Sequence, residues 1–226
     1  MKSEFYEIKD KSYYNEWRED IFNILYNKER KFERSLEVGC GSGILSRELK
    51  KQGLVNYSVG IEPYAKIVLD NNFNEFYSKD IESMLIELDR NKKFDLIILA
   101  DVLEHTLDPW LILKTLRSNF LSNDGMVIIS LPNFRNILTL YKILINNSFK
   151  YESEGVFDIT HMRFFCLNDI KELIEGANLK LSNLTPSYLH KRYKFFSINR
   201  LRILNMLTLG LFKFLLADQV ICICKK

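Results

Sequence analysis

A glycine-rich turn between an apolar run and a helical pattern constrains the fold of this chain more than any other feature. Residues Ser35–Gly43 read SLEVGCGSG, with glycines at positions 39, 41 and 43. Glycine lets the backbone approach a ligand closely, because no Cβ intervenes. The dinucleotide-binding pattern is GxGxxG, whereas this chain has GxGxG and places Ile44 where the third glycine would stand. The turn therefore predicts a strand-to-helix connection at a ligand site, with a plain structural turn as the alternative.

Short apolar runs alternate with longer helical patterns along the first two thirds of the chain. Such alternation gives an α/β fold, in which helices cover both faces of a mostly parallel sheet. Ligands of these sheets bind beyond the carboxyl ends of the strands. The predicted strands are Ser35–Val38, Tyr57–Ile61, Phe94–Ala100 and Gly125–Leu131, and the predicted helices are Ile44–Gln52, Tyr64–Asn71, Ile81–Asp89 and Pro109–Phe120.

The last part of the chain is more irregular but returns to the same alternation. A helix over Ile137–Ile145 precedes a loop-like stretch, and a second helix over Leu167–Ala177 ends before Asn178, which tolerates the left-handed conformation. Strands are predicted near Leu179–Leu184 and at Gln219–Cys224, with an apolar helix over Leu201–Leu216 between them. We therefore expect one domain over residues 1–226.

Two acidic residues stand at positions suited to a nucleoside. Glu62 closes the second strand, 19 residues after Gly43, where a carboxylate can accept both hydroxyls of a ribose. Asp80 precedes a predicted helix, so it can cap that helix, accept from an adenine amine, or do both. The two acids strengthen the interpretation of the glycine turn as part of a binding site.

Three motifs together resemble those of the class I, seven-stranded S-adenosylmethionine-dependent methyltransferases. They are LEVGCGSG, VGIEP and FDLIILADVLEHTLDP, and the resemblance runs from about Tyr13 to Ala177 with the closing strand. DVLEH, together with the later THxRFF segment, resembles a bacterial branch of ubiquinone-type and polysaccharide-associated enzymes. The resemblance implies a Rossmann-like fold with a seven-stranded, mostly parallel sheet, an antiparallel last strand, and S-adenosylmethionine as cofactor.

The same resemblance implies which residues hold the cofactor. Glu37 and Gly39 would lie along its methionine portion, Glu62 would hold the ribose, and Asp80 with Ile81 would hold the adenine. The segment from Ala100 to Leu103 would form the floor of the pocket under the sulfonium. The full expected set is Glu37, Gly39, Cys40, Gly41, Gly43, Glu62, Pro63, Asp80, Ile81, Ala100, Asp101, Val102 and Leu103.

Methyl transfer to an alcohol usually needs a general base near the cofactor, whereas a neutral amine needs only positioning. His161, in the DITHMRFF segment, is the expected base or acceptor-orienting residue, because histidine titrates near neutral pH. His105 and Arg163 are the expected substrate-binding residues. The alternatives are that His105 fixes a loop and that Arg163 pairs with Asp158 or Glu154. No metal-binding spacing stands out, so metal-independent transfer is expected.

Composition restricts the remaining possibilities. The net charge of +3 is too small to indicate a nucleic-acid partner. The four cysteines, at 40, 166, 222 and 224, lack the spacing of a disulfide or zinc framework, which favours a reducing cytoplasm. The first residues have no apolar signal region, and no run of about 18 apolar residues is present to cross a membrane. The oligomeric state is not indicated.

Three segments around the expected site have open roles. Residues 1–30 are expected to form a helical lid, although plain packing on the sheet is the alternative. Residues 132–166 and 186–216 are expected to be acceptor-side or cap elements. The basic and apolar part of 186–216 can instead be a packed helix with a solvated basic face, a dimer contact or a peripheral membrane contact.

The leading function is methyl transfer to an oxygen or nitrogen of a small-molecule acceptor. By family analogy the first candidate acceptor is a sugar or nucleotide-linked sugar of surface-glycan biosynthesis. One alternative is an NAD-type oxidoreductase that uses the same glycine turn. Another is a module that retains the fold and binds the cofactor without catalysis.

Overall fold

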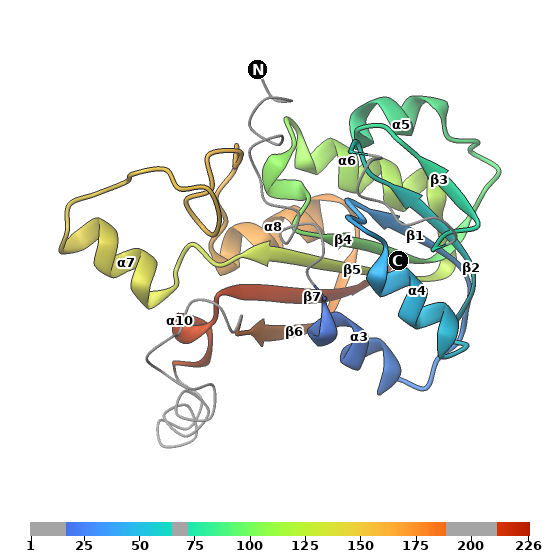
Figure 1. The fold of residues 1–226 in the computed structure, drawn as a ribbon, viewed down its shortest axis with the longest axis horizontal. Coiled ribbons are helices and arrows are strands. Elements are labelled where there is room, and N and C mark those ends of the chain that lie inside the picture. The colour runs from blue at the N-terminus through green and yellow to red at the C-terminus, as the bar shows by residue number, and fades with distance from the viewer. Residues whose placement is uncertain (1–16, 65–71, 189–211) are drawn as a thin grey trace.

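A computed structural model describes residues 17–64, 72–188 and 212–226, and a seven-stranded sheet forms its centre (Figure 1). The strand order is β3-β2-β1-β4-β5-β7-β6. The first five strands run parallel, and β7 runs antiparallel to both of its neighbours. The strands are β1 Phe32–Val38, β2 Val55–Ile61, β3 Glu75–Tyr77, β4 Phe94–Ala100, β5 Leu121–Pro132, β6 Lys180–Ser187 and β7 Gln219–Lys225. The predicted fold class, including the antiparallel last strand, is confirmed.

Helices cover both faces of this sheet. On one face pack α3 (Glu19–Tyr26) and α4 (Ile44–Lys51), and on the other pack α5 (Ile81–Glu87), α6 (Pro109–Thr115) and α8 (Leu167–Gly176). The remaining helical elements are the 3-10 turn η2 (Leu103–His105), the π-turn η3 (Leu116–Phe120), α7 (Ile137–Leu144) and α10 (Lys213–Leu216). In Figure 1, α7 lies apart from the sheet, and Thr139 is its only buried residue.

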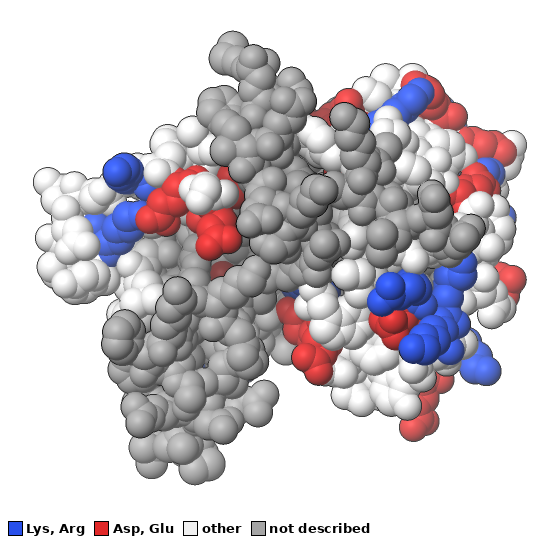
Figure 2. Space-filling model, in the orientation of Figure 1, with Lys and Arg blue, Asp and Glu red and all other residues white. Residues whose placement is uncertain are grey.

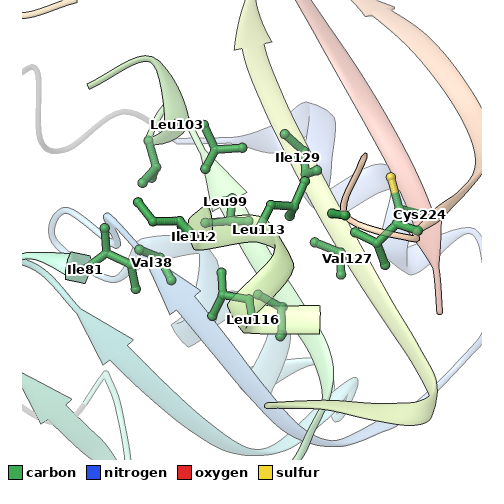
Figure 3. Close-up of a cluster of buried hydrophobic side chains, with 14 of the residues drawn as sticks. Val38, Ile81, Leu99, Leu103, Ile112, Leu113, Leu116, Val127, Ile129 and Cys224 are labelled. Atoms are coloured by element: carbon green, nitrogen blue, oxygen red, sulfur yellow. The ribbon is translucent and has the colours of Figure 1, made fainter. Parts of the chain in front are cut away.

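The central strands are apolar on both faces, because each face is covered by helices. In β4, Leu96 and Ile98 join the cluster under α3 and α4, whereas Ile97 and Leu99 join the cluster under α5, α6 and α8. Figure 3 shows part of the second cluster, where side chains of α6 meet those of β4, β5 and β7. Cys222 and Cys224 are fully buried in it, as expected of core residues.

Several local predictions hold at the ends of elements. Asp80 caps α5 by accepting from the Ser83 amide at 2.8 Å, and Asp108 caps α6 by accepting from the Leu111 amide at 2.9 Å. Asn178 follows α8 with a positive φ of 55°. Three strands begin earlier than predicted: β1 at Phe32, β2 at Val55 and, by the largest margin, β5 at Leu121 and not at Gly125. Residues 122–124 of β5 are polar and largely exposed, so they resemble a turn in the sequence.

Other predictions fall wholly or partly outside the described residues. These include residues 65–71 of the predicted helix Tyr64–Asn71, residues 201–211 of the predicted apolar helix, and residues 1–16 of the predicted lid. The described part of that lid is α3, whose Ile21 and Leu25 are completely buried against the sheet. Over the described ranges, no helix has the length and hydropathy needed to cross a membrane.

Candidate active site

A cavity of about 600 Å³ opens beyond the carboxyl ends of the parallel strands. Its wall includes the glycine turn after β1, the segment after β2, the start of α5 and the segment after β4. Its far side is formed by residues from the loop between α7 and α8. This volume is typical of a site for a small molecule or a nucleotide cofactor.

The glycine turn fits closely against its neighbours. Gly39 has φ +64°, and a Cβ added there would lie 2.6 Å from the Val102 side chain, which belongs to the floor of the cavity. Gly43 has φ +79° and caps α4, and a Cβ there would lie 2.6 Å from the Phe73 ring. Both positions combine a left-handed backbone with a close contact, so a larger residue would move the turn or the cavity wall.

Two buried carboxylates stand on either side of this turn. Glu62 is 5% exposed and accepts from the amides of Gly41 and Tyr64, each at 3.1 Å. Glu37 is also 5% exposed, and its carboxylate accepts a hydrogen bond from the Ser46 hydroxyl. Burial raises the pKa of Glu37 to about 7, against the hydrogen bonds from Ser46, and burial also raises the pKa of Glu62. Both acids are therefore placed to gain from a ligand that carries hydroxyl or ammonium donors.

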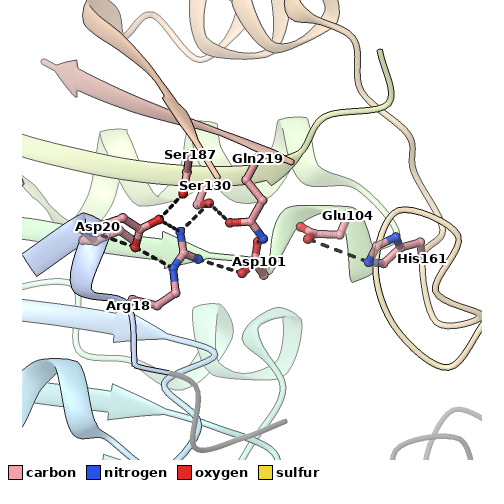
Figure 4. A network of polar contacts seen from close by, with 9 residues as sticks. Arg18, Asp20, Asp101, Glu104, Ser130, His161, Ser187 and Gln219 are labelled. Atoms are coloured by element: carbon pink, nitrogen blue, oxygen red, sulfur yellow. Dashed lines mark hydrogen bonds and ion pairs between the residues drawn. The ribbon is translucent and has the colours of Figure 1, made fainter. Parts of the chain in front are cut away.

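The floor of the cavity is held by an ionic network that joins distant parts of the chain (Figure 4). Asp101 has a positive φ of 57°, and its carboxylate accepts from Arg18 at 2.7 Å and from Gln219 at 2.7 Å. Arg18 also contacts Asp20 at 3.0 Å and donates to the Ser130 hydroxyl at 2.9 Å. Burial alone would raise the pKa of Asp20, but the charge and hydrogen bonds of Arg18, together with hydrogen bonds from Ser187 and the Ile21 amide, lower it. The network ties α3 to β4, β5 and β7.

Three titratable side chains meet at the opposite end of the cavity. Glu104 and His105 belong to η2, directly after β4, and His161 comes from the loop between α7 and α8. His161 Nε2 lies 4.0 Å from a carboxylate oxygen of Glu104, and the two imidazole rings lie 4.7 Å apart between centroids. The side chains of Glu104 and His161 point toward each other in Figure 4. The loop is joined to η2 by its backbone, because the amides of Met162 and Arg163 both donate to the Glu104 carbonyl.

Most of the residues expected from the sequence line this one cavity. Of the expected cofactor residues, only Gly43 and Leu103 are not part of its lining. His105 and His161 line it, whereas Arg163 does not. The Arg163 guanidinium donates to the carbonyls of Leu107 at 2.7 Å and Met162 at 3.0 Å, so it braces the loop after η2 and forms neither expected pair with Asp158 or Glu154. Burial raises the pKa of Cys40, which disfavours the reactive thiolate form of this side chain.

Sequence reasoning missed the ionic network and the role of Glu104 in the cavity. Arg18 lies 83 residues from Asp101, and Gln219 lies 118 residues from it, so no local spacing indicates their contact. Glu104 could have been found from the sequence, because it stands between Asp101 and His105 in the segment after a predicted strand.

Outside the cavity, Figure 2 shows basic side chains gathered over α4, which contributes Arg47, Lys50 and Lys51.

Comparison with known proteins places the chain in a family. Residues 9–184, well over half of the chain, match the model of a family described as a methyltransferase domain. The chain belongs to this methyltransferase family. Its relatives include the ubiquinone biosynthesis O-methyltransferase of Coxiella burnetii (strain RSA 493 / Nine Mile phase I), which is 26% identical over 172 residues, 73% of this chain and 71% of that protein. The enzyme of the same name from Glaesserella parasuis is 30% identical over 122 residues, about half of each chain.

Solved structures agree with the observed fold of this methyltransferase. A SAM dependent methyltransferase from Archaeoglobus fulgidus superposes with a TM-score of 0.64 at 18% identity, over 94% of this chain and 96% of that chain. Magnesium protoporphyrin IX methyltransferase from Synechocystis, solved with bound SAH, superposes with a TM-score of 0.60 at 16% identity, over 92% of this chain and 81% of that chain. At these identities the likeness shows the shared fold.

Proposed function

We propose that this methyltransferase transfers a methyl group to an oxygen or nitrogen of a small-molecule acceptor, and that oxygen is the favoured atom. One observation carries the proposal: a single cavity joins the glycine turn and its two buried acids to a cluster of one glutamate and two histidines. The name of the similar ubiquinone biosynthesis O-methyltransferases supports an oxygen acceptor. A sugar or nucleotide-linked sugar stays the acceptor suggested by the THxRFF segment, and it also offers hydroxyl groups.

S-adenosylmethionine is the methyl donor and supplies an electrophilic methyl group on a sulfonium. The residues of this chain have the tasks of binding and orientation. In this proposal Glu62 accepts the ribose hydroxyls, Asp80 and Ile81 border the adenine, and Glu37 receives the ammonium of the methionine portion, and the support is that all four line the cavity. The acidic side chains of the cavity wall suit a positively charged ligand, and the close contact of Gly39 with Val102 suits a slender one. His161, at the far end of the cavity, orients the acceptor or takes its proton.

S-adenosylhomocysteine, the expected product, should stabilise the native protein, whereas NAD should not. A ligand that binds only the native state at 100 times its Kd adds about 2.7 kcal/mol. For a chain of this size the melting temperature should then rise by about 5–10 °C. A thermal-shift assay with each ligand measures this difference. Stabilisation by NAD alone would favour the oxidoreductase alternative and overturn the proposal.

Catalysis itself is tested by the transfer of label. The protein is incubated with methyl-labelled S-adenosylmethionine and a small-molecule extract, and labelled products are separated. Appearance of label in a product below the size of a protein supports the proposal. Binding of S-adenosylhomocysteine without transfer to any fraction, across extracts that support transfer by another methyltransferase, would indicate a module that binds the cofactor without catalysis.

The affinity for S-adenosylhomocysteine should fall as the pH drops below 7, because Glu37 must be ionised to pair with the ammonium. Burial raises the pKa of Glu37 to about 7, and Glu62 and Arg18 are its charged neighbours. At pH 6 about one site in eleven is ionised, so the apparent Kd should be about tenfold higher than at pH 8. Calorimetry at both pH values measures it. Glu37→Gln should bind weakly with little dependence on pH over this interval, and an equal pH dependence in that variant would contradict the assignment.

A further inference from the structure

The cluster at the far end of the cavity has the composition of a metal site. Glu104, His105 and His161 each offer one ligand atom, and these atoms all lie within 4.8 Å of one another. Donor atoms held about 2.0–2.2 Å from one ion lie about 3–4.4 Å apart, depending on the angle between them. Small side-chain rotations are therefore enough to bring the three atoms around a single ion.

The Glu104 carboxylate is buried in an environment that a bound cation would stabilise. Glu104 is 1% exposed, and neither of its side-chain oxygens has a hydrogen-bond partner within the described ranges of the chain. The Nε2 atom of His161 is 4.0 Å away, too far for a hydrogen bond. A buried carboxylate without hydrogen bonds is costly unless a charged partner compensates it.

Hydrogen bonds orient both imidazoles in the way that metal ligands require. His161 Nδ1 lies 3.0 Å from the Val156 carbonyl, and His105 Nδ1 lies 3.2 Å from the Thr160 carbonyl. A carbonyl oxygen can only accept, so Nδ1 of each ring donates, and Nε2 of the neutral ring then carries the lone pair that a metal ion needs. The Thr160 hydroxyl, which also contacts His105, donates to Asp158 at 2.6 Å. Metal-binding histidines usually have their second nitrogen fixed to a carbonyl or carboxylate in this manner.

We propose that Glu104, His105 and His161 bind one divalent first-row transition ion, such as Zn²⁺, Mn²⁺ or Fe²⁺, at the acceptor end of the cavity. Two imidazole nitrogens with one carboxylate favour these ions over Mg²⁺ and Ca²⁺, which prefer oxygen ligands. This proposal differs from the expectation of metal-independent transfer. That expectation rested on local spacing, and His161 lies 56 residues after His105 in the sequence.

The proposed ion has a specific task, and this task rests on the proposed function. Three protein ligands leave coordination positions open toward the cavity, where an acceptor hydroxyl can bind. Coordination lowers the pKa of that hydroxyl, so its proton leaves to water and a lone pair on the oxygen becomes available. The oxygen–methyl bond then forms as the sulfur–methyl bond breaks, and the electron pair of the broken bond stays on sulfur. His161 thus orients the acceptor through the ion.

The test is metal binding by untagged, metal-free, full-length protein. Calorimetric titration with Zn²⁺ and with Mn²⁺ should show one saturable equivalent for at least one of them, and Co²⁺ should give visible absorption bands typical of nitrogen and oxygen coordination. Glu104→Gln should weaken binding about a hundredfold or more, because loss of even an outer contact to a metal ligand costs 10–100-fold. Glu154→Gln removes a carboxylate that lines the same cavity outside the cluster, and it should leave the affinity unchanged within about twofold.

Two further measurements keep the outcomes distinct. Metal-free Glu104→Gln should melt close to metal-free wild type, because glutamine has nearly the size of glutamate and its neutral amide costs less to bury than a carboxylate, and this establishes that the variant folds. Equal metal affinity in folded Glu104→Gln, or no saturable binding by wild type, would overturn the metal site. S-adenosylhomocysteine binding is measured on the same samples. Cofactor binding without metal binding rejects only the metal site, and metal binding without cofactor binding rejects only the proposed function.

Discussion

Glu62→Gln should weaken the binding of S-adenosylhomocysteine about a hundredfold. The carboxylate is 5% exposed and already accepts from the Gly41 amide, so it links the glycine turn to the segment after β2. Hydrogen bonds to a charged acceptor contribute about 1.5–3 kcal/mol each, and the amide of glutamine replaces one charged acceptor with a donor. Two ribose hydroxyls would then meet a partner that can accept from only one of them. Isothermal calorimetry at pH 8 measures the change in Kd.

Glu82→Gln is the matched control for this variant. Glu82 also lines the cavity, but its carboxylate contacts the Leu107 amide at 3.3 Å and does not contact the glycine turn. Removal of this charge should change the Kd by less than about threefold, since only the general field of the cavity is altered. Equal losses in both variants would show that net charge, and not the ribose contact, governs affinity.

Arg18→Met should lower the free energy of unfolding by about 3 kcal/mol, an effect unusual for one polar substitution. Arg18 is 8% exposed and is held by Asp101, Asp20 and the Ser130 hydroxyl. Its loss leaves two carboxylates in a largely buried region without their cation, while methionine keeps most of the apolar volume. Urea denaturation followed by circular dichroism measures the change.

Arg47→Met tests whether the loss depends on the buried network. Arg47 pairs with Glu48 at 3.0 Å, but its side chain is 47% exposed. Exposed ion pairs contribute about 0–1 kcal/mol, so this variant should differ from wild type by less than about 0.5 kcal/mol. A similar loss in both arginine variants would mean that the contacts of Arg18 with Asp101 and Asp20 have no special energetic role.

The sequence predicted the sheet and the cofactor end of the cavity better than the acceptor end, and the reason is physical. The glycine turn and Glu62 each stand at the end of a strand whose apolar pattern is local, Asp80 stands at a local helix-capping signal, and parallel strands bring their carboxyl ends to one edge. The partners of Arg18 and the grouping of His161 with Glu104 depend on how distant segments pack. No periodicity within a short window records such contacts.

The charge of Arg163 suggested a role in the sequence that differs from its contacts in the structure. Arg163 was expected to bind substrate or pair with an acid, but its guanidinium donates to two carbonyls and braces the loop that carries His161. Arginine has five donors in a fixed plane, so backbone oxygens satisfy it as well as carboxylates do. The sequence identifies the residue type but not which acceptor the loop conformation presents.

The position of β7 has a consequence for how the chain matures during synthesis. This strand is the last of the seven along the chain, yet it lies between β5 and β6 and pairs with both. Until β7 has been synthesised, β5 and β6 each have an exposed strand edge, and Gln219 is not in place to hold Asp101. Donor binding should therefore follow the synthesis of β7, and a chain truncated before Gln219 should aggregate and lack an intact methyl-donor pocket.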